Sequence, residues 1–300
     1  MEVDIAIVNY NSGNCLQECL QSLDKFDSNY IKSISVVDNC SSDLSNEIDL
    51  SLLSDIRSKT YFINENINHG FAKACNIGSR TGNSEFILFL NPDTFLSEDI
   101  FSKIAEIPKS KLNTQITGVN LLDETNQNSV SAANFPSFKM LLIKSFGLHK
   151  IFPFLDRQLI KFSQDGIYDV DVVSGAFFFI SRDAFNNLNG FDERFFVYYE
   201  EVDLALRAKN NLDMHCVIDS SFKVNHIGGG CTQASLYALS LNINSKLLYS
   251  KKHFKTYQHL LLLSSVFFIE IPIRILTNIN QFSNLSSLSR LYLELGNYVK

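Results

Sequence analysis

The sequence predicts an α/β protein with a mostly parallel central sheet flanked by helices and a helical extension at its C-terminal end. Strand-like apolar runs and helix-like periodicity alternate four times in roughly the first 100 residues, as in parallel sheets with right-handed crossovers. The clearest strand lies in Glu85–Thr94 (E-F-I-L-F-L-N-P-D-T), whose apolar run is typical of a strand buried on both faces. Pro92 cannot donate to a strand ladder, so we expect the strand to end at Asn91. The carboxylate of Asp93 is then left at the sheet edge where α/β proteins bind ligands.

The other elements of the first half follow from the same two patterns. Strands are expected at Asp4–Asn9, Ile34–Asp38 and Lys59–Ile63. Helices are expected from Leu16 to about Phe26, after Asp43, over Phe71–Gly78, and after Ser97, the predicted cap of a helix with Glu98 and Asp99 in its first turn.

The alternation weakens after Thr117. The aromatic and basic stretch Asn126–Gly166 is interpreted as an insertion over the sheet edge. Further on we expect a long strand at Val170–Ile180, helices at Arg182–Leu188 and from about Glu200, and short strands at Met214–Ile218 and Phe222–His226. Beyond Thr232 the pattern is helical to the end, with an apolar stripe of Phe282, Leu285, Leu288, Tyr292 and Leu295.

Composition limits the possible partners and compartments. The net charge of −6 argues against a nucleic-acid partner. The six cysteines include no C-x-x-C pair, which is typical of reduced thiols in a cytoplasmic protein. Asp4 interrupts the first apolar run, so no signal peptide is expected.

One segment, Leu260–Leu276, is apolar enough to suggest a membrane. Its apolar block ends at Ile269, before Glu270, Pro272 and Arg274, and is too short to span a bilayer, so we expect peripheral contact at most. The neighbouring basic residues suit anionic headgroups: Lys251, Lys252, His253 and Lys255. Packing on the preceding domain or in a homodimer is the alternative.

Polar turn residues follow the first, second and fourth strands and should meet at one edge of the sheet. Asp93 suits a divalent metal ion, with a turn or helix cap as the structural alternative. Asp38 suits a pyrimidine N–H or a ribose hydroxyl, with an Asx turn as the alternative. The absence of G-x-G-x-x-G and G-x-x-x-x-G-K-[ST] argues against a dinucleotide-binding protein and a P-loop NTPase.

A second group of acids lies in Phe191–Arg207. Glu200 and Glu201 follow four aromatic residues, and such crowding raises carboxyl pKa values in a way that suits a general base. The alternative is a pair of first-turn acids favoured by the helix dipole. Asp203 and Arg207 have the spacing of a structural ion pair, opposite a buried face of Val202, Ala205 and Leu206. His226 precedes Gly228-Gly229-Gly230, whose backbone would allow close approach of a phosphate.

In this order the motifs resemble the family 2 glycosyltransferases with a GT-A fold, and in particular their rhamnosyltransferase-like branch in bacterial surface polysaccharide (O-antigen or capsule) synthesis. The resemblance spans about residues 3–231. Its motifs are V-N-Y-N at Val8, S-V-V-D-N-C-S-S-D at Ser35, N-H-G-F-A-K-A-C-N-I-G at Asn68, F-L-N-P-D-T at Phe89, S-G-A-F-F-F-I-S-R at Ser174, G-F-D-E-R-F-F-V-Y-Y-E-E-V-D-L-A-L-R at Gly190 and N-H-I-G-G-G at Asn225.

The resemblance implies a role for each motif. Nucleotide binding falls to Val8, Asn9, Tyr10, Asn11, Asp38, Asn39, Phe71, Lys73, Asn76, Asn91 and Pro92. Asp93 and His226 would hold Mg²⁺ or Mn²⁺, Glu201 with Glu200 and Asp203 would form the catalytic acids, and Gly175, Asp192 and Tyr199 would meet the acceptor. The implied reaction is an inverting transfer from a dTDP- or UDP-linked sugar to a saccharide or polyprenyl-linked acceptor, at or near the cytoplasmic face of the membrane. The implied domains are a catalytic domain at 1–231, with a nucleotide-binding half at 1–115 and an acceptor half at 116–231, and a helical region at 232–300.

Two other functions are the alternatives to an active glycosyltransferase. A catalytically impaired family member that binds nucleotide sugars or serves as a scaffold is favoured by two departures from the family pattern. Glu201 stands where the family usually has Asp, and N-P-D offers one carboxylate where D-x-D offers two. A nucleotidyltransferase would require a basic, glycine-rich loop near the N-terminus, and the sequence has none.

Overall fold

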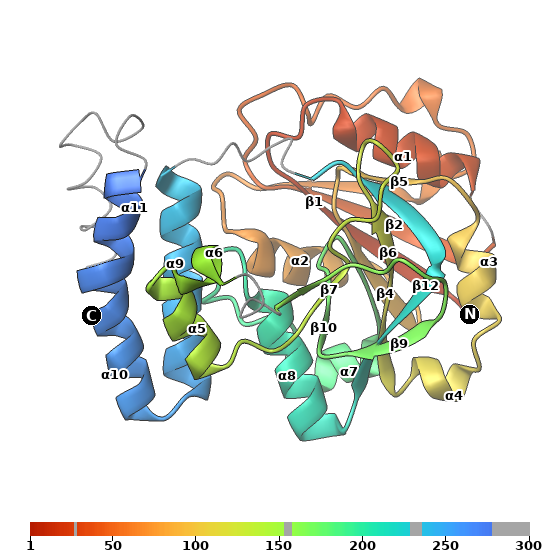
Figure 1. The fold of residues 1–300 in the computed structure, drawn as a ribbon. Helices are drawn as coiled ribbons and strands as arrows, with labels where there is room; N and C mark the ends of the chain where they lie inside the picture. Colours follow the sequence, from red (N-terminus) through yellow and green to blue (C-terminus); the bar gives the residue numbers. More distant parts are fainter. Residues whose placement is uncertain (27–28, 153–157, 229–235, 278–300) are drawn as a thin grey trace. The chain divides into compact units, whose positions relative to one another are not determined.

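The computed structural model describes residues 1–26, 29–152, 158–228 and 236–277, and its elements can be followed along the chain in Figure 1. Residues group into two compact units. The first consists of Met1–Asn134, Leu159–Glu193 and Glu200–Cys231, and the second of Phe135–Gln158, Arg194–Tyr199 and Thr232–Lys300. Two segments from within the predicted catalytic domain therefore group with the C-terminal helices.

The first unit is built on a mixed sheet with the strand order β3-β2-β1-β4-β11-β6-β12-β5, and β9 pairs with β12. Its strands are β1 (Val3–Asn9), β2 (Ile31–Asp38), β3 (Thr60–Asn64), β4 (Phe86–Leu90), β5 (Thr94–Leu96), β6 (Gln115–Leu122), β9 (Ile167–Val170), β11 (Phe177–Ser181) and β12 (His215–His226). The first four strands in this order pair in parallel, whereas β11 is antiparallel to both of its neighbours. A small second sheet has the order β10-β7-β8, from Val172–Val173, Ala132–Ala133 and Leu159–Ile160.

Helices cover both faces of the parallel strands. α1 (Cys15–Lys25) buries Leu16 and Leu20 in one core with Ile5 and Ile7 of β1. α2 (Phe71–Ser79) packs on the other face, where a Cβ on Gly78 would lie 3.1 Å from that of Ala6. Alternate β1 side chains thus face different helices, which explains why its residues are all buried. The other described α-helices of this unit are α3 (Ile100–Ala105), α4 (Lys109–Leu112), α7 (Arg182–Asn187) and α8 (Glu200–Leu212), and two 3₁₀ helices lie at Leu50–Leu52 and Arg57–Lys59.

The second unit is mainly helical where it is described, apart from Arg194–Tyr199 and short connections. It consists of α5 (Phe138–Ser145), α6 (Leu148–Ile151), α9 (Leu236–His253), α10 (Thr256–Ser265), a π-helical turn at Val266–Glu270 and α11 (Ile271–Thr277). Leu141 of α5, Ile243 and Leu247 of α9, and Leu262 of α10 share its apolar core. The predicted stripe from Phe282 to Leu295 lies outside the described residues.

The predicted α/β architecture is confirmed, but four local predictions are wrong. No helix follows Asp43, because its carboxylate accepts hydrogen bonds from Ser45 N and Gly13 N in a turn. Asp99, not Ser97, caps α3. The expected strand Val170–Ile180 is broken into β9, β10 and β11, and the turn at Ser174 precedes β11. The two short strands after Met214 form one strand, β12, with an irregularity between Asp219 and Lys223.

A buried polar network fixes the end of the sheet opposite the candidate site. Asp4 in β1 accepts hydrogen bonds from Ser33 Oγ of β2 at 2.6 Å and from Ser84 N at 2.7 Å. Its Oδ2 lies 2.6 Å from Arg182 Nη2, and Arg182 also donates to the carbonyls of Ser79 and Ser84. One carboxylate therefore joins β1, β2 and the residues that flank β4 and β11.

We expect Asp4→Ala to lower the free energy of unfolding by about 3–5 kcal/mol, because it leaves the half-buried Arg182 guanidinium without a counter-charge. Chemical denaturation followed by circular dichroism measures the change. Glu2→Ala is the control, since Glu2 and Lys32 form an exposed pair and should cost less than about 1 kcal/mol. An equal, small loss in both variants would contradict the role given to Asp4.

Candidate active site

The carboxyl edge of the parallel strands gathers the polar residues that the sequence singled out. β1 ends at Asn9 directly opposite Asp38 at the end of β2. The Asn9 amide donates to Asp38 Oδ1 at 2.7 Å, and Ser41 N donates to Asp38 Oδ2 at 3.1 Å. Asn9 is fully buried, so it orients the Asp38 carboxylate from behind. Val8 is also buried, whereas Tyr10 is exposed, and the Asn11 side chain accepts a hydrogen bond from Ser42 N.

Asn39 holds the loop that leads into α2. Its amide donates to Asn68 Oδ1 at 2.8 Å, and its Oδ1 accepts a hydrogen bond from His69 N at 2.9 Å. Asn39 is buried, so it shapes this edge through the loop. His69 Nε2 in turn lies 2.9 Å from Glu65 Oε2, a pair to which sequence reasoning gave no role. Its i,i+4 spacing was the available signal, but the segment lacks the helical periodicity that gives such spacing meaning.

The predicted nucleotide residues of α2 separate into two groups. Phe71 and Lys73 lie half-buried in the first turn, behind the cap residue Gly70. Asn76 lies further along, where its amide donates to Phe191 O and accepts from Phe191 N, both at 2.9 Å. Asn76 thus fixes the turn after α7. A cavity of about 280 Å³ beside it is lined by Asn76, Ser79, Arg80, Phe185, Asn186, Asn189, Gly190, Phe191 and Glu193, and so contains neither Asp93 nor the acids of α8.

Asn91, Asp93 and His226 meet at the end of β4. The antiparallel pairing of β5 with β12 sets His226 opposite Thr94, and this register brings the imidazole to Asp93. His226 Nε2 lies 3.3 Å from Asp93 Oδ1 and 3.5 Å from Asn91 Nδ2. Burial alone would raise the pKa of Asp93. The hydrogen bond and charge of His226, together with backbone N–H groups, outweigh burial and hold the pKa of Asp93 below its ordinary value. Pro92 is half-buried in the turn, and Gly229 and Gly230 lie outside the described residues.

Glu200 and Glu201 open α8, and neither forms an ion pair with another described residue. The Oε2 atom of each is buried and has no hydrogen-bond partner within the described residues. Burial raises the pKa of Glu200 well above its ordinary value, and the adjacent Glu201 carboxylate raises it further. Burial also raises the pKa of Glu201. Such a carboxyl group takes up a proton more readily than an exposed one.

A short turn connects Glu201 with the end of β4. A Cβ added to Gly175 would lie 4.0 Å from Glu201 Cβ, and the next residue, Ala176, accepts a hydrogen bond from Asn91 N at 3.1 Å. Glu200 instead lies near Cys75 of α2. Burial raises the pKa of the Cys75 thiol, and the charge of Glu200 raises it further. Glu201 is therefore the acid on the side of the N-P-D turn.

Asp203, the third predicted catalytic acid, is fully buried and pairs with Arg207 at 2.7 Å. Arg207 also donates to the carbonyls of Leu188 and Gly190. The predicted ion pair is present, but its expected exposed position is wrong. The buried face of α8 contains Leu204 beside Val202 and Ala205, while Leu206 is only half-buried. Arg207 explains the difference, because it binds carbonyls that would otherwise face α8 unpaired.

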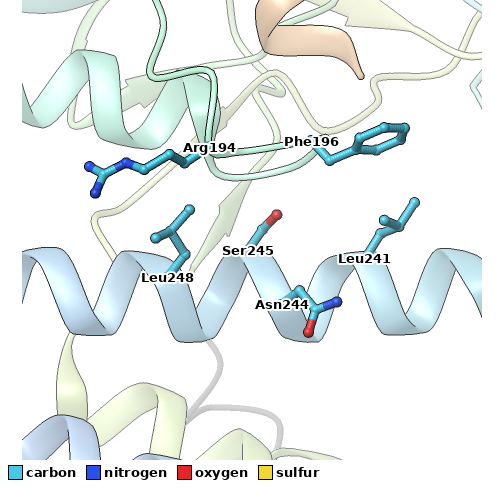
Figure 2. A pocket seen from close by; sticks show the side chains of 6 residues that line it. All are labelled: Arg194, Phe196, Leu241, Asn244, Ser245 and Leu248. Carbon is cyan, nitrogen blue, oxygen red and sulfur yellow. The ribbon is translucent and has the colours of Figure 1, made fainter. Parts of the chain in front are cut away.

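Two consecutive tyrosines before α8 have left-handed backbones, with φ of +68° at both Tyr198 and Tyr199. Non-glycine residues rarely adopt this conformation, and it persists where the surroundings enforce it. Within the second unit, Ser245 of α9 donates to Val197 O at 2.7 Å, and the Tyr199 ring lies 5.5 Å from that of Tyr249. Figure 2 shows Leu241, Ser245 and Leu248 of α9 pointing toward the segment with Arg194 and Phe196, and the hollow between them is too small for a water molecule. Asp192, the remaining predicted acceptor residue, lies half-buried in the first unit.

Comparison with known proteins matches the same part of the chain as the sequence motifs. A profile of the family described as glycosyltransferase like family 2 matches residues 3–223. The low-salt glycan biosynthesis hexosyltransferase Agl10 of Haloferax volcanii is 26% identical over 231 residues, which cover 73% of this chain and 66% of Agl10. The rhamnosyltransferase WbbL of Escherichia coli K12 is 28% identical over 212 residues, which cover 68% of this chain and 76% of WbbL. The chain thus spans just under two thirds of the archaeal relative.

Solved structures agree in fold. GalNAc-T7, crystallised with UDP, GalNAc and Mn²⁺, superposes with a TM-score of 0.61 at 14% identity over 84% of this chain and 48% of its own. Residues 1–349 of Staphylococcus aureus TarS, in complex with UDP-GlcNAc, give a TM-score of 0.56 at 13% identity over 100% of this chain and 81% of that one. At this identity the likeness concerns the fold, and it confirms the predicted GT-A architecture.

We expect Glu200→Gln to raise the melting temperature at neutral pH by a few degrees. With its raised pKa, Glu200 binds a proton more tightly in the folded protein than in the unfolded chain. Stability is therefore lost as the pH rises from about 4.3, the ordinary glutamate value, through the folded-state pKa. The gain in the variant should shrink as the pH falls toward that value.

Thermal unfolding across a pH series measures this effect, and Glu106→Gln, at an exposed glutamate, is the matched control. A lower melting temperature of Glu200→Gln at neutral pH would mean that the Glu200 carboxylate is stabilised in the folded protein, against the argument.

Proposed function

This chain belongs to glycosyltransferase like family 2, and we propose that it transfers a sugar, rhamnose or a similar hexose, from a nucleotide diphosphate to a saccharide or lipid-linked acceptor with inversion at the anomeric carbon. The observation that carries the proposal is the desolvated Glu200–Glu201 pair, linked by the Gly175 turn to the edge that holds Asp93 and His226. The names of Agl10 and WbbL support a role in glycan assembly.

The donor nucleotide is proposed to bind across the ends of β1 and β2. Asp38 is held by Asn9 and Ser41, and its remaining lone pairs suit a pyrimidine N–H or a ribose hydroxyl. This favours dTDP- or UDP-linked sugars. The first turn of α2 suits the diphosphate, because it carries Lys73 and no side chain of a described residue caps it through Gly70.

A divalent ion, Mg²⁺ or Mn²⁺, fits the end of β4 only together with the donor. Among the described residues no three His, Cys, Asp or Glu side chains are grouped closely enough to hold a metal. Asp93 and His226 supply two ligands, and the Asn91 amide oxygen is a third candidate. Mg²⁺ is commonly held by one or two carboxylates with substrate phosphates completing its shell. When bound there, the ion would neutralise charge on the departing diphosphate.

Glu201 is proposed as the general base. Its carboxylate takes the proton of the acceptor hydroxyl, and the hydroxyl oxygen bonds to the anomeric carbon from the face opposite the nucleotide. The bond from that carbon to the diphosphate oxygen breaks, and the diphosphate leaves with the electron pair. The raised pKa of Glu201 favours this proton transfer, because a base works best when its pKa is near the working pH.

A catalytically impaired, nucleotide-sugar-binding member of the family is the second candidate. The observation that favours it is the Glu200–Glu201 pair, in which Glu201 extends one methylene further than the aspartate that the resemblance leads us to expect. This candidate differs from the first in one measurable property: it binds the donor with metal present but transfers no sugar.

We expect Glu201→Gln and Asp93→Ala each to lower the rate of sugar transfer by at least about a hundredfold. Glu201→Gln should still bind the donor, because only the proton acceptor is lost, whereas Asp93→Ala should lose the metal-dependent part of binding. Radiolabelled sugar transfer and calorimetry measure the two effects. Glu124→Gln, at an exposed carboxylate, is the control. Near-normal transfer by Glu201→Gln would rule out its role as the base.

We expect dTDP- or UDP-linked sugars to raise the melting temperature more than GDP-linked sugars when Mn²⁺ is present, because a ligand that binds only the folded protein stabilises it by mass action. A thermal-shift screen with and without Mn²⁺ tests this. Asp93→Ala should keep the metal-independent part of the shift. Preference for a GDP-linked sugar would contradict the pyrimidine role given to Asp38.

A further inference from the structure

The helical stretch Thr256–Arg274 exposes several large apolar side chains and buries an acid, Glu270, beside its apolar core residues. It comprises α10, the π-helical turn and most of α11, and by length and composition these 19 residues could cross a membrane. A core helix of a soluble protein passes the same test, but only 28% of this window is buried. The sequence predicts an apolar block that is too short to span a bilayer. The helix is in fact long enough, because it continues through Pro272 to Arg274.

The outer face of this stretch is apolar. Tyr257, Leu260, Leu261 and Phe268 are 57%, 52%, 55% and 80% exposed, and Ser264 between them is also exposed. Their spacing of three or four residues places them on one side of the helix. We call Tyr257, Leu260, Leu261, Ser264 and Phe268 the outer stripe.

The inner face contains the charges. Glu270 is buried and contacts both Lys246 Nζ of α9 and Ser145 Oγ of α5, and Arg274 Nη2 lies 3.0 Å from its other oxygen. Leu262 and Val266 pack beside these groups in the core of the helical unit. A helix that exposes large apolar side chains and buries its charged groups is better suited to a lipid environment than to water.

Charge around the stripe points to the kind of lipid. Residues 236–277 carry five Lys or Arg (Lys246, Lys251, Lys252, Lys255 and Arg274) and one acid, Glu270, although the whole chain has a net charge of −6. Lys251 and Lys255 are exposed just before α10 begins. Each such lysine near an anionic bilayer strengthens binding by about fivefold.

We propose that the outer stripe docks into the interfacial layer of an anionic lipid bilayer, with Lys251 and Lys255 at its headgroups. The helix lies in the interface and does not cross it. Its inner face is tied through Glu270 to α9, which carries Asn244, Ser245, Lys246 and Ser250 and ends in Lys251–His253. Crossing the hydrocarbon would take these polar groups with it, at a cost that an interfacial position avoids. The proposal does not depend on the sugar-transfer reaction.

Flotation of the full chain with vesicles of phosphatidylcholine and phosphatidylglycerol tests the proposal. We expect the protein to float with these vesicles, to bind pure phosphatidylcholine at least about tenfold more weakly, and to be released by alkaline carbonate. Phe268→Glu should reduce binding at least about tenfold, and Lys251→Gln with Lys255→Gln about twentyfold. Ile167→Glu, at an exposed apolar residue of β9, is the matched control and should float normally.

Four results would overturn the proposal. Wild type that stays unbound, or Phe268→Glu that floats as well as wild type, would remove the stripe as a lipid contact. Resistance to alkaline carbonate would indicate a spanning helix. A dimer in light scattering that Phe268→Glu dissociates, without flotation, would show that a second copy of the chain covers the stripe. Circular dichroism and thermal unfolding confirm that each variant is folded, and donor binding is measured separately because the stripe takes no part in it.

Discussion

The parallel register of β1 with β2 and β4 determines where the polar groups of the candidate site lie. Asn9 stands opposite Asp38 and Ile7 opposite Leu90, so β4 ends two residues before β1 and β2, and the turn residues of all three share one edge. A slip of one residue would turn Asn9 away from Asp38 and exchange the faces that α1 and α2 cover. Asp4 secures the register from the other end, since its carboxylate meets Ser33, Ser84 and Arg182 only in this alignment.

Buried carboxylates serve different purposes here, and their partners distinguish them. Asp4 faces a guanidinium, so its charge is compensated and stabilises the sheet. Asp93 faces His226, which keeps it ionised and suited to a ligand. Glu200 and Glu201 face neither, so burial raises their pKa values and costs folding free energy. α8 tolerates this cost because the next turn is held by Asp203 and Arg207, which bonds two carbonyls outside the helix. In the proposed role of Glu201 as the general base, stability is given up where a proton would be accepted.

Local pattern was enough to predict the parallel half of the fold and the edge at which Asp38 and Asp93 lie. It could not show that His226 reaches Asp93, because that depends on β5 pairing with β12 across more than a hundred residues. Nor could it show that Asn9 and Asn39 act from behind the site. An asparagine after a strand looks the same in the sequence whether its amide faces a ligand or a neighbouring residue. The failures at Asp43 and Ser97 have another cause, because several nearby side chains compete for the same backbone N–H groups and only the three-dimensional path of the chain selects one.

The helical unit that presents the outer stripe on α10 and the π-helical turn also holds, through α9, the segment leading into α8. Ser245 and Tyr249 of α9 contact Val197 and Tyr199, and the chain passes from Tyr199 directly into Glu200. Left-handed tyrosines relax unless their surroundings enforce them, so these contacts maintain the turn from which the acid pair begins. In the proposed arrangement, the helical unit both docks on the membrane and sets the turn before Glu201, the proposed base. This gives a physical reason why Arg194–Tyr199 groups with the C-terminal helices, which therefore do not form a separate tail.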